Sequence, residues 1–203
     1  MTIHLHKNDI PADLKHDGDI AIDTETMGLR PNRDPLCVVQ FSFGDGDAHI
    51  VQLDRATYDA PNLKKLLNDN PHASLFHFAR FDVAVLKKFL GVECKTIYCT
   101  RSASKLVRTY TDRHGLRDCC RELLGTDLNK QQQSSYWGAE ELTEAQQEYA
   151  ANDVLYLHAL KEEFDTRLAR EGRTDLAART FEAIRTVADL DLEGWLYEDF
   201  FAH

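Results

Sequence analysis

Two acidic residues, Asp23 and Glu25, close a short apolar strand that the alternating isoleucines predict over residues 20–25. Residues two apart on an extended backbone project to the same side, so these carboxylates repel each other and resist ionising together. A hard divalent cation, Mg²⁺ or Mn²⁺, is the usual resolution, because such ions prefer carboxylate oxygens. The alternative is a strand that leads into a solvated acidic turn.

Two further acids stand in contexts that favour a site. Asp82 lies in the first turn of a helix predicted over residues 80–90, where an acid can also simply favour the positive helix end. Asp153 lies among alanine, valine and leucine in a helix predicted over residues 143–170, and a charge buried there without a partner is costly. Tyr149 shares a helix face with Asp153, and the alternative for this pair is a hydrogen bond to each other.

The four acids have one common explanation. Four ionised carboxylates would be balanced by two divalent cations, and two metals about 4 Å apart form the clamp used for in-line phosphoryl transfer to water. One metal lowers the pKa of the attacking water, and the other stabilises the leaving oxygen. Tyr149 is then placed to orient or deprotonate that water. Because a phenol with an ordinary pKa near 10 is a weak base, the metal must supply most of the activation.

The elements that position these acids are strands followed by alternating helices and strands. Three strands joined by short turns and then a strand–helix–strand unit indicate an α/β fold, with a mixed five-stranded sheet flanked by helices. Residues 1–19 are predicted to form a short strand and a turn, and residues 126–141 a loop. We predict strands at 20–25, 36–43, 48–53, 74–78 and 96–99, and helices at 61–67, 80–90, 100–108, 115–124, 143–170 and 174–186.

Composition limits the class of protein and of partner. A length of 203 residues suits one α/β domain, and no apolar run approaches a membrane span, so we expect a cytoplasmic protein without a membrane partner. The five cysteines form no C-x-x-C pair, which favours reduced thiols over zinc or disulfides. A formal net charge of −10 with no basic block disfavours a firm grip on long nucleic acid, because such a grip neutralises many phosphates.

The order and spacing of these motifs resemble the DEDDy 3′→5′ exonucleases, over about residues 18–165. Within that superfamily the chain resembles ribonuclease D, and it is most similar to the short single-domain bacterial group called nanoRNase C. The motifs that carry the resemblance are Asp23-Thr24-Glu25, Asp82 in the segment 77–82, Tyr149 with Asp153, and the segments 130–137 and 148–157. The resemblance implies an RNase H-like (DnaQ-like) exonuclease fold, with two Mg²⁺ or Mn²⁺ ions held by the four acids.

The resemblance also implies substrate contacts. Leu29 would be a wedge against the terminal bases, and backbone groups from Thr24 to Met27 would contact the 3′ end. Other candidates come from the residues themselves: an arginine binds phosphate through two nitrogens, whereas a loop of this composition is often only solvated. These candidates are His77, Arg80, Arg108 and Tyr110, with Lys130 and Gln133 weaker, and the resemblance over residues 130–137 adds Trp137. For His77 the alternative is a core histidine with a hydrogen-bond partner.

Two departures from ribonuclease D shape the expected function. The chain ends before the helical C-terminal nucleic-acid-binding domains of that family, and Tyr136 stands where ribonuclease D has an aspartate. We expect an exonuclease domain over residues 1–170 and a helical extension over 171–203, packed on the domain or at an oligomer interface. The nanoRNase C resemblance and the aromatic residues of the extension favour a homo-oligomer, from a dimer up to an octameric ring.

The expected activity is 3′-5′ exoribonuclease cleavage of short RNA, down to dinucleotides, into nucleoside 5′-monophosphates. Within the enzyme class, the alternatives are ribonuclease D-like trimming of longer structured RNA, and 3′-5′ exonuclease action on DNA, including short single strands. The alternative from another class is a binding module that has lost catalysis. Retention of all four acids and Tyr149 argues against it, since clustered acids mark functional sites.

Overall fold

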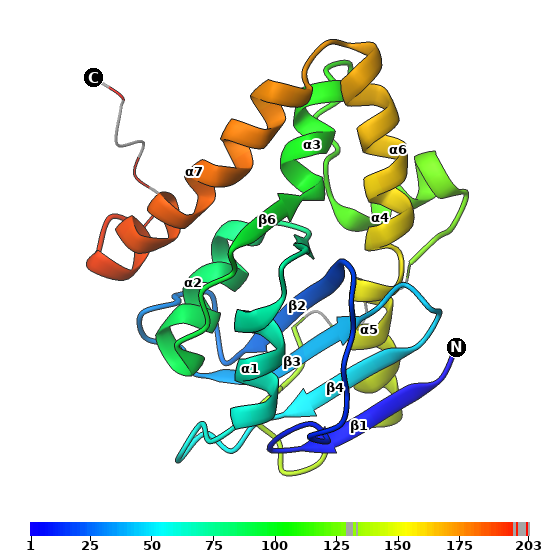
Figure 1. Cartoon of the computed structure of the whole chain (residues 1–203). Coiled ribbons are helices and arrows are strands. Elements are labelled where there is room, and N and C mark those ends of the chain that lie inside the picture. The colour runs from blue at the N-terminus through cyan, green and yellow to red at the C-terminus, as the bar shows by residue number, and fades with distance from the viewer. Residues whose placement is uncertain (129–131, 133, 197, 199–201, 203) are drawn as a thin grey trace.

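Six strands form one mixed sheet, in the order β1-β4-β3-β2-β5-β6 (Figure 1). The computed structural model describes residues 1–128, 132, 134–196, 198 and 202. β2 lies antiparallel to β3 and parallel to β5, which places the acid-bearing strand inside the sheet. The strands are β1 (Ile3–Lys7), β2 (Ile20–Thr26), β3 (Leu36–Ser42), β4 (Ala48–Gln52), β5 (Ala73–Phe76) and β6 (Thr96–Cys99).

Alternation along the central strands builds a core on each face of the sheet. Val39 and Phe41 of β3 belong to the larger apolar cluster, whereas Val38 packs with Ile50 and Trp137 in a smaller cluster. The period of two sends neighbouring side chains to opposite faces, and every residue of β3 is buried. The sheet is therefore a well-packed support, and the C-terminal end of β2 differs from it because its residues are polar and only partly buried.

Helices cover both faces of the sheet, with α1 and α2 on one and α5 on the other (Figure 1). α7 packs along α2 and over the edge strand β6, and α3 packs against α6. The helices are α1 (Pro61–Asp69), α2 (Ala79–Leu90), α3 (Thr100–Val107), α4 (Leu116–Cys119), the π-helical turn η1 (Cys120–Leu124), α5 (Glu144–Leu155), α6 (Leu157–Arg170) and α7 (Thr174–Glu193). Within the described residues, no helix is long and apolar enough to cross a membrane.

Two parts of the sequence prediction were wrong: the sheet has six strands and not five, and the long helix predicted over residues 143–170 is two helices. The strand expected within residues 1–19 is β1, and it joins the sheet as a sixth strand, parallel to β4. Its polar residues gave no sign that it joins the sheet, because an edge strand does not need to be buried on both faces. The helix predicted over residues 143–170 breaks at Tyr156, where the backbone reaches φ −102° and ψ −3°, so α5 and α6 are separate helices.

Other boundaries moved less. The helix predicted over 115–124 is a short α-helical turn followed by a π-helical turn, and the last helix runs to Glu193, beyond the predicted end at 186. Gly194 ends α7 with φ +115°, a conformation that glycine adopts without steric cost. The division of the chain at residue 170 stays a prediction.

Three histidines hold the edge strand β1 against β4. The His49 ring stacks on His4, with centroids 4.7 Å apart, and on His6 at 5.3 Å. His6 Nε2 lies 3.1 Å from His49 Nδ1, which requires a proton on only one of the two nitrogens. Burial, followed by the charges of His4 and His6, lowers the pKa of His49 from 6.5 to about 4.

We expect this cluster to weaken the fold in acid. Because the folded pKa of His49 lies below its unfolded value, the unfolded chain binds the proton first; stability is complete above pH 6.5 and falls as the pH drops towards 4. His49 is only 7% exposed, but the His4 side chain stacked on it is 43% exposed, and solvent screens the repulsion between them. The loss should therefore be roughly 1–2 kcal/mol. Urea unfolding of wild type and His49→Phe between pH 4 and 7 measures it. Equal losses in both proteins would contradict the assignment.

Candidate active site: a buried carboxylate cluster

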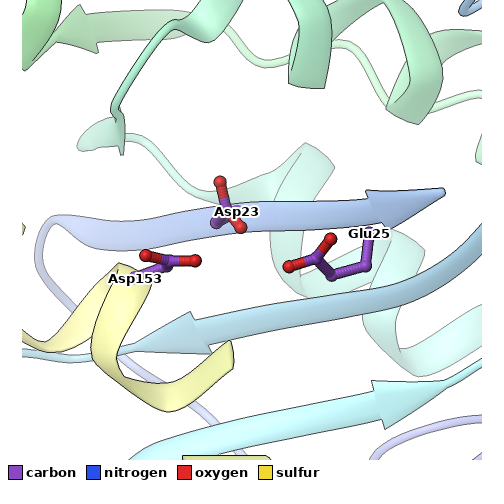
Figure 2. A group of neighbouring side chains, drawn as sticks. All are labelled: Asp23, Glu25 and Asp153. Carbon is purple, nitrogen blue, oxygen red and sulfur yellow. The ribbon is translucent and has the colours of Figure 1, made fainter. Parts of the chain in front are cut away.

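Three carboxylates from two elements converge at the polar end of β2. Asp23 and Glu25 project from β2, and Asp153 reaches them from α5, with one oxygen of each within 4.8 Å of the others (Figure 2). The structure thus brings together Asp23, Glu25 and Asp153, three of the four acids that the sequence analysis grouped. Oxygen atoms at this separation, from three acids, form a donor set that suits a hard divalent cation.

The cluster resists ionisation as it stands. Burial is the largest cause that raises the pKa of Asp23 well above its ordinary value, and the charges of Asp82, Asp153 and Glu25 add to it. Burial and the charges of Asp153 and Asp82 likewise raise the pKa of Glu25. A cation among these groups would reverse both effects, because it favours the charged carboxylates.

Asp82 is the most buried of the four acids, at 3% exposure, and lies in the first turn of α2. Thr24 Oγ1 donates to its Oδ1 at 2.7 Å, so the residue between Asp23 and Glu25 ties β2 to α2. Burial raises the Asp82 pKa to about 7, although the bond from Thr24 lowers it. Asp82 therefore lies beside the cluster formed by Asp23, Glu25 and Asp153. It is hydrogen-bonded to Thr24 and lies near the positive end of α2.

The helix break at Tyr156 changes the electrostatic setting of Asp153. The sequence predicted this acid in the middle of a long helix, but it lies in the last turn of α5, which ends at Leu155. The C-terminal end of a helix carries partial negative charge, which disfavours an acid and favours a cation. The backbone of α5 thus adds to the negative potential at the cluster, a contribution that the predicted continuous helix would lack.

Gln40 is a site residue that the sequence analysis missed. It lies opposite Asp23 on β3, is fully buried, and its Nε2 donates to Asp23 Oδ2. The bond fixes the orientation of the Asp23 carboxylate. A signal was available, because Gln40 interrupts an otherwise apolar strand core, and a buried amide needs a partner.

We expect Gln40→Met to weaken divalent-metal affinity or activity by about 10- to 100-fold, the usual cost of losing a residue that orients a metal ligand. Methionine has a similar shape but cannot donate to Asp23. Activity measured against Mg²⁺ concentration should show a higher metal requirement and partial recovery at saturation. An unchanged metal requirement would show that Asp23 keeps its orientation without this bond.

Tyr149 lies one helical turn before Asp153 and packs beside Trp137, with ring centroids 6.0 Å apart. Burial, the charges of Asp153, Glu25 and Asp23, and a hydrogen bond to Asp153 together raise the pKa of Tyr149 above its ordinary 10. The hydroxyl therefore keeps its proton at neutral pH. Of the two roles the sequence suggested, orienting a water molecule suits this phenol better than deprotonating one.

Two clefts meet at the acids. The first cleft, about 430 Å³, holds all four acids and Tyr149, and the second, about 260 Å³, shares Asp23, Tyr149 and Asp153 with it. The first cleft is also lined by the predicted substrate residues Thr24, Met27, Leu29, His77 and Trp137. The second cleft continues past His77 and Phe78 to Arg101 and Arg117. The acids thus lie at the junction of two connected hollows.

The loop after β2 presents Leu29 at the first cleft with 74% of its surface exposed. Asp34 organises this loop: its Oδ2 accepts from the Arg30 backbone at 2.9 Å, and its Oδ1 accepts from Arg33 Nε at 2.6 Å. A Cβ on Gly28 would lie 2.3 Å from Asp34 Oδ2, so the tight loop requires glycine there. An exposed leucine held on such a loop is a ready apolar contact for a base.

Three predicted substrate residues have other partners. Arg80 pairs with buried Asp191 of α7 through two hydrogen bonds of 2.5 Å. Arg108, only 1% exposed, donates to Glu122, to Ser104 Oγ at 3.0 Å and to the Arg113 carbonyl at 2.6 Å. Tyr110 also donates to Glu122.

None of Arg80, Arg108 and Tyr110 is among the described residues that line the two clefts. Their partners instead join helices or loops to one another, so we assign them structural roles and do not carry them into the proposed substrate site. The weaker candidates Lys130 and Gln133 lie outside the described residues.

Comparison with known proteins agrees with this geometry. A family model described as 3′-5′ exonuclease matches residues 6–169. Ribonuclease D of Gluconacetobacter diazotrophicus is 32% identical over 165 residues, which is 81% of this chain and 42% of that protein. The chain thus spans about two fifths of the ribonuclease D relatives that it matches.

Solved structures extend the comparison over the whole chain. Brucella melitensis NrnC with bound Mg²⁺ is 51% identical with a TM-score of 0.94, and each chain covers 100% of the other. NrnC bound to pGG is 52% identical, with a TM-score of 0.95 and coverage of 100% of this chain and 99% of that one. Escherichia coli RNase D, at 22% identity and a TM-score of 0.73, shares the fold over 84% of this chain and 44% of its own.

These matches confirm the predicted exonuclease fold and the resemblance to ribonuclease D and to the short single-domain group. They assign the chain to a family of enzymes, which argues against the alternative of a binding module that has lost catalysis. A cluster of acids that suits divalent cations fits a family described as 3′-5′ exonuclease. The chain belongs to the 3′-5′ exonuclease family, as an enzyme of the ribonuclease D and NrnC type.

Proposed function

We propose that the enzyme degrades short RNA, down to dinucleotides, to nucleoside 5′-monophosphates by two-metal hydrolysis. The observation that supports this most is the position of the acids at the junction of two small clefts. A phosphodiester placed over the acids would leave room for one nucleoside on each side. The volume of the first cleft, about 430 Å³, is in the range of small-ligand sites, and that of the second, about 260 Å³, is slightly below it.

Asp23, Glu25, Asp82 and Asp153 would hold two Mg²⁺ or Mn²⁺ ions. When bound, such ions lower the pKa of a water molecule and stabilise the leaving oxygen. Side chains of the protein position the reacting groups. Gln40 orients the Asp23 carboxylate and Thr24 orients that of Asp82. The protonated Tyr149 hydroxyl orients the attacking water. Leu29 limits how far the terminal bases can enter the first cleft.

The preference for short RNA has two supports. A net charge of −10 disfavours the many phosphate contacts that long RNA or DNA would need. Brucella melitensis NrnC, a structure of which contains bound pGG, matches 100% of this chain. Trimming of longer RNA and action on DNA are the competing activities, as in the ribonuclease D relatives and in the Aquifex aeolicus DNA polymerase I, which is 28% identical over 200 residues.

A time course with 5′-labelled RNAs of two, three, five and twenty nucleotides tests the proposal, with Mg²⁺, Mn²⁺ or EDTA. We expect the dinucleotide to disappear at least as fast as the longer RNAs, and EDTA to stop every reaction. Rapid shortening of the twenty-nucleotide RNA to a persistent dinucleotide would overturn the proposal in favour of trimming. Faster cleavage of matched DNA would favour a DNA exonuclease.

We also propose that the enzyme acts in the cytoplasm as a homo-oligomer, between a dimer and an octameric ring, with residues 171–203 contributing to the contact. Trp195 keeps 43% of its surface exposed beyond the end of α7, which suits an interface. Phe200 and Phe201 of the same aromatic tail lie outside the described residues. Light scattering of wild type and Trp195→Ser measures the subunit number, and a wild-type monomer would refute this proposal.

A further inference from the structure

Phe78 is an aromatic residue that borders both clefts, and the sequence analysis assigned it no role. It follows β5 and precedes α2, and 41% of its surface is exposed. It lines the first cleft together with Leu29 and the second together with Arg101. A large apolar side chain that stays exposed at a polar cleft invites a partner with an apolar face.

The backbone at Phe78 is held in an unfavourable conformation. Its φ of +82° and ψ of +45° lie in the left-handed region, which phenylalanine rarely adopts. The residue is the N-cap of α2, yet its side chain caps no backbone group. Helix capping therefore does not explain a phenylalanine here. Strain of this kind persists mainly where function requires it, and Asp82 follows in the first turn of the same helix.

Arg101 lies against the ring of Phe78. Its guanidinium carbon lies 5.1 Å from the centroid of the Phe78 ring, within the range of a cation–π contact. Arg101 comes from α3, so the contact spans two helices and limits rotation of the ring. A ring held in this way loses little further freedom when a second flat group stacks on it.

We infer that Phe78, backed by Arg101, is a stacking platform for a nucleobase of the substrate. Every base has a π-face, so such a platform binds bases of any identity, as a scavenger of mixed RNA fragments requires. The inference rests on the proposed function, and it deepens that function by naming a residue that binds substrate without touching the metal site. Stacking of one base on an aromatic side chain corresponds to about a 10- to 100-fold effect on binding.

The test combines one substitution with one substrate change. Phe78→Gly removes the ring and relaxes the left-handed backbone, and Phe78→Trp keeps a stacking surface. Each is assayed on a dinucleotide and on the two dinucleotides that lack either the 5′ or the 3′ base. We expect Phe78→Gly to lower kcat/KM about 10- to 100-fold, mainly through KM, and to lose sensitivity to removal of one particular base. Phe78→Trp should retain most activity.

Two outcomes would overturn the inference. One is full sensitivity to both base removals in Phe78→Gly, and the other is unchanged kcat/KM. The Mg²⁺-induced rise in the unfolding midpoint must match wild type, which shows that the acid cluster is intact. If wild type does not cleave dinucleotides, the proposed function fails by itself, and the same comparison on longer RNA with an abasic 3′-terminal or penultimate nucleotide still decides the role of Phe78.

Discussion

Asp153→Asn should lower RNA hydrolysis by about 10³-fold or more while making the metal-free protein more stable. The asparagine keeps the shape of the side chain but removes one of the three charges that meet within 4.8 Å. Activity falls because a bound divalent ion contributes several kcal/mol to the reaction, and each 1.36 kcal/mol is a factor of ten. Stability rises because the Asp153 charge helps to raise the pKa values of both Asp23 and Glu25.

Thermal unfolding with and without Mg²⁺ separates the two effects. A gain of about 1 kcal/mol raises the midpoint of a protein of this size by roughly 2–4 °C. Wild type at an ion concentration about 100 times its Kd should gain about 2.7 kcal/mol, and the variant should lose most of that gain. Glu148→Gln is the matched control, since it removes an exposed acid from the same helix. A metal response equal to wild type in Asp153→Asn would refute the site.

Tyr149→Phe should lower kcat by about 10²-fold with little change in metal affinity. The cost is that of losing a positioned group in proton transfer, at the lower end of the usual range. Burial, the largest cause that raises the Tyr149 pKa, favours the protonated hydroxyl, so the substitution removes a hydrogen-bond donor from the site. Single-turnover rates at saturating Mg²⁺ measure the effect on the chemical step.

The matched control for this substitution is Tyr156→Phe, which makes the same chemical change at the end of α5. We expect that variant to keep nearly full activity, because Tyr156 lines neither cleft within the described part of the chain. If Tyr149→Phe instead weakens Mg²⁺ binding as much as it weakens turnover, the phenol serves chiefly to hold the Asp153 carboxylate.

Residues in strong local patterns were predictable from the sequence. The period-two strand placed Asp23 and Glu25 on one side, and the capping box at Thr143 and Gln146 marked the start of α5. Those two signals depend on neighbours along the chain, which the sequence shows directly. That Asp153 lies next to Asp23 and Glu25 could be predicted only by considering motifs far apart in the sequence together. The structure brings these three acids together.

Features that depend on tertiary packing were not predictable. Arg108 was a candidate phosphate ligand because an arginine binds phosphate through two nitrogens, but its burial and its pairing with Glu122 depend on how η1 packs. The break at Tyr156 has no proline or glycine to announce it. The left-handed backbone of Phe78 was equally hidden, because phenylalanine is a poor indicator of positive φ.

The acid cluster connects β2 to α5, two segments far apart in the chain. Without a cation, like charges oppose the docking of α5, so this helix should be among the segments that open locally at low cost. A bound ion would hold α5 against β2, because both elements would supply its ligands. Backbone amides of Glu144–Leu155 would then exchange with solvent more slowly, and proteases would find this helix a poorer target. Removal of the ion by a chelator would therefore make α5 easier for proteases to cleave.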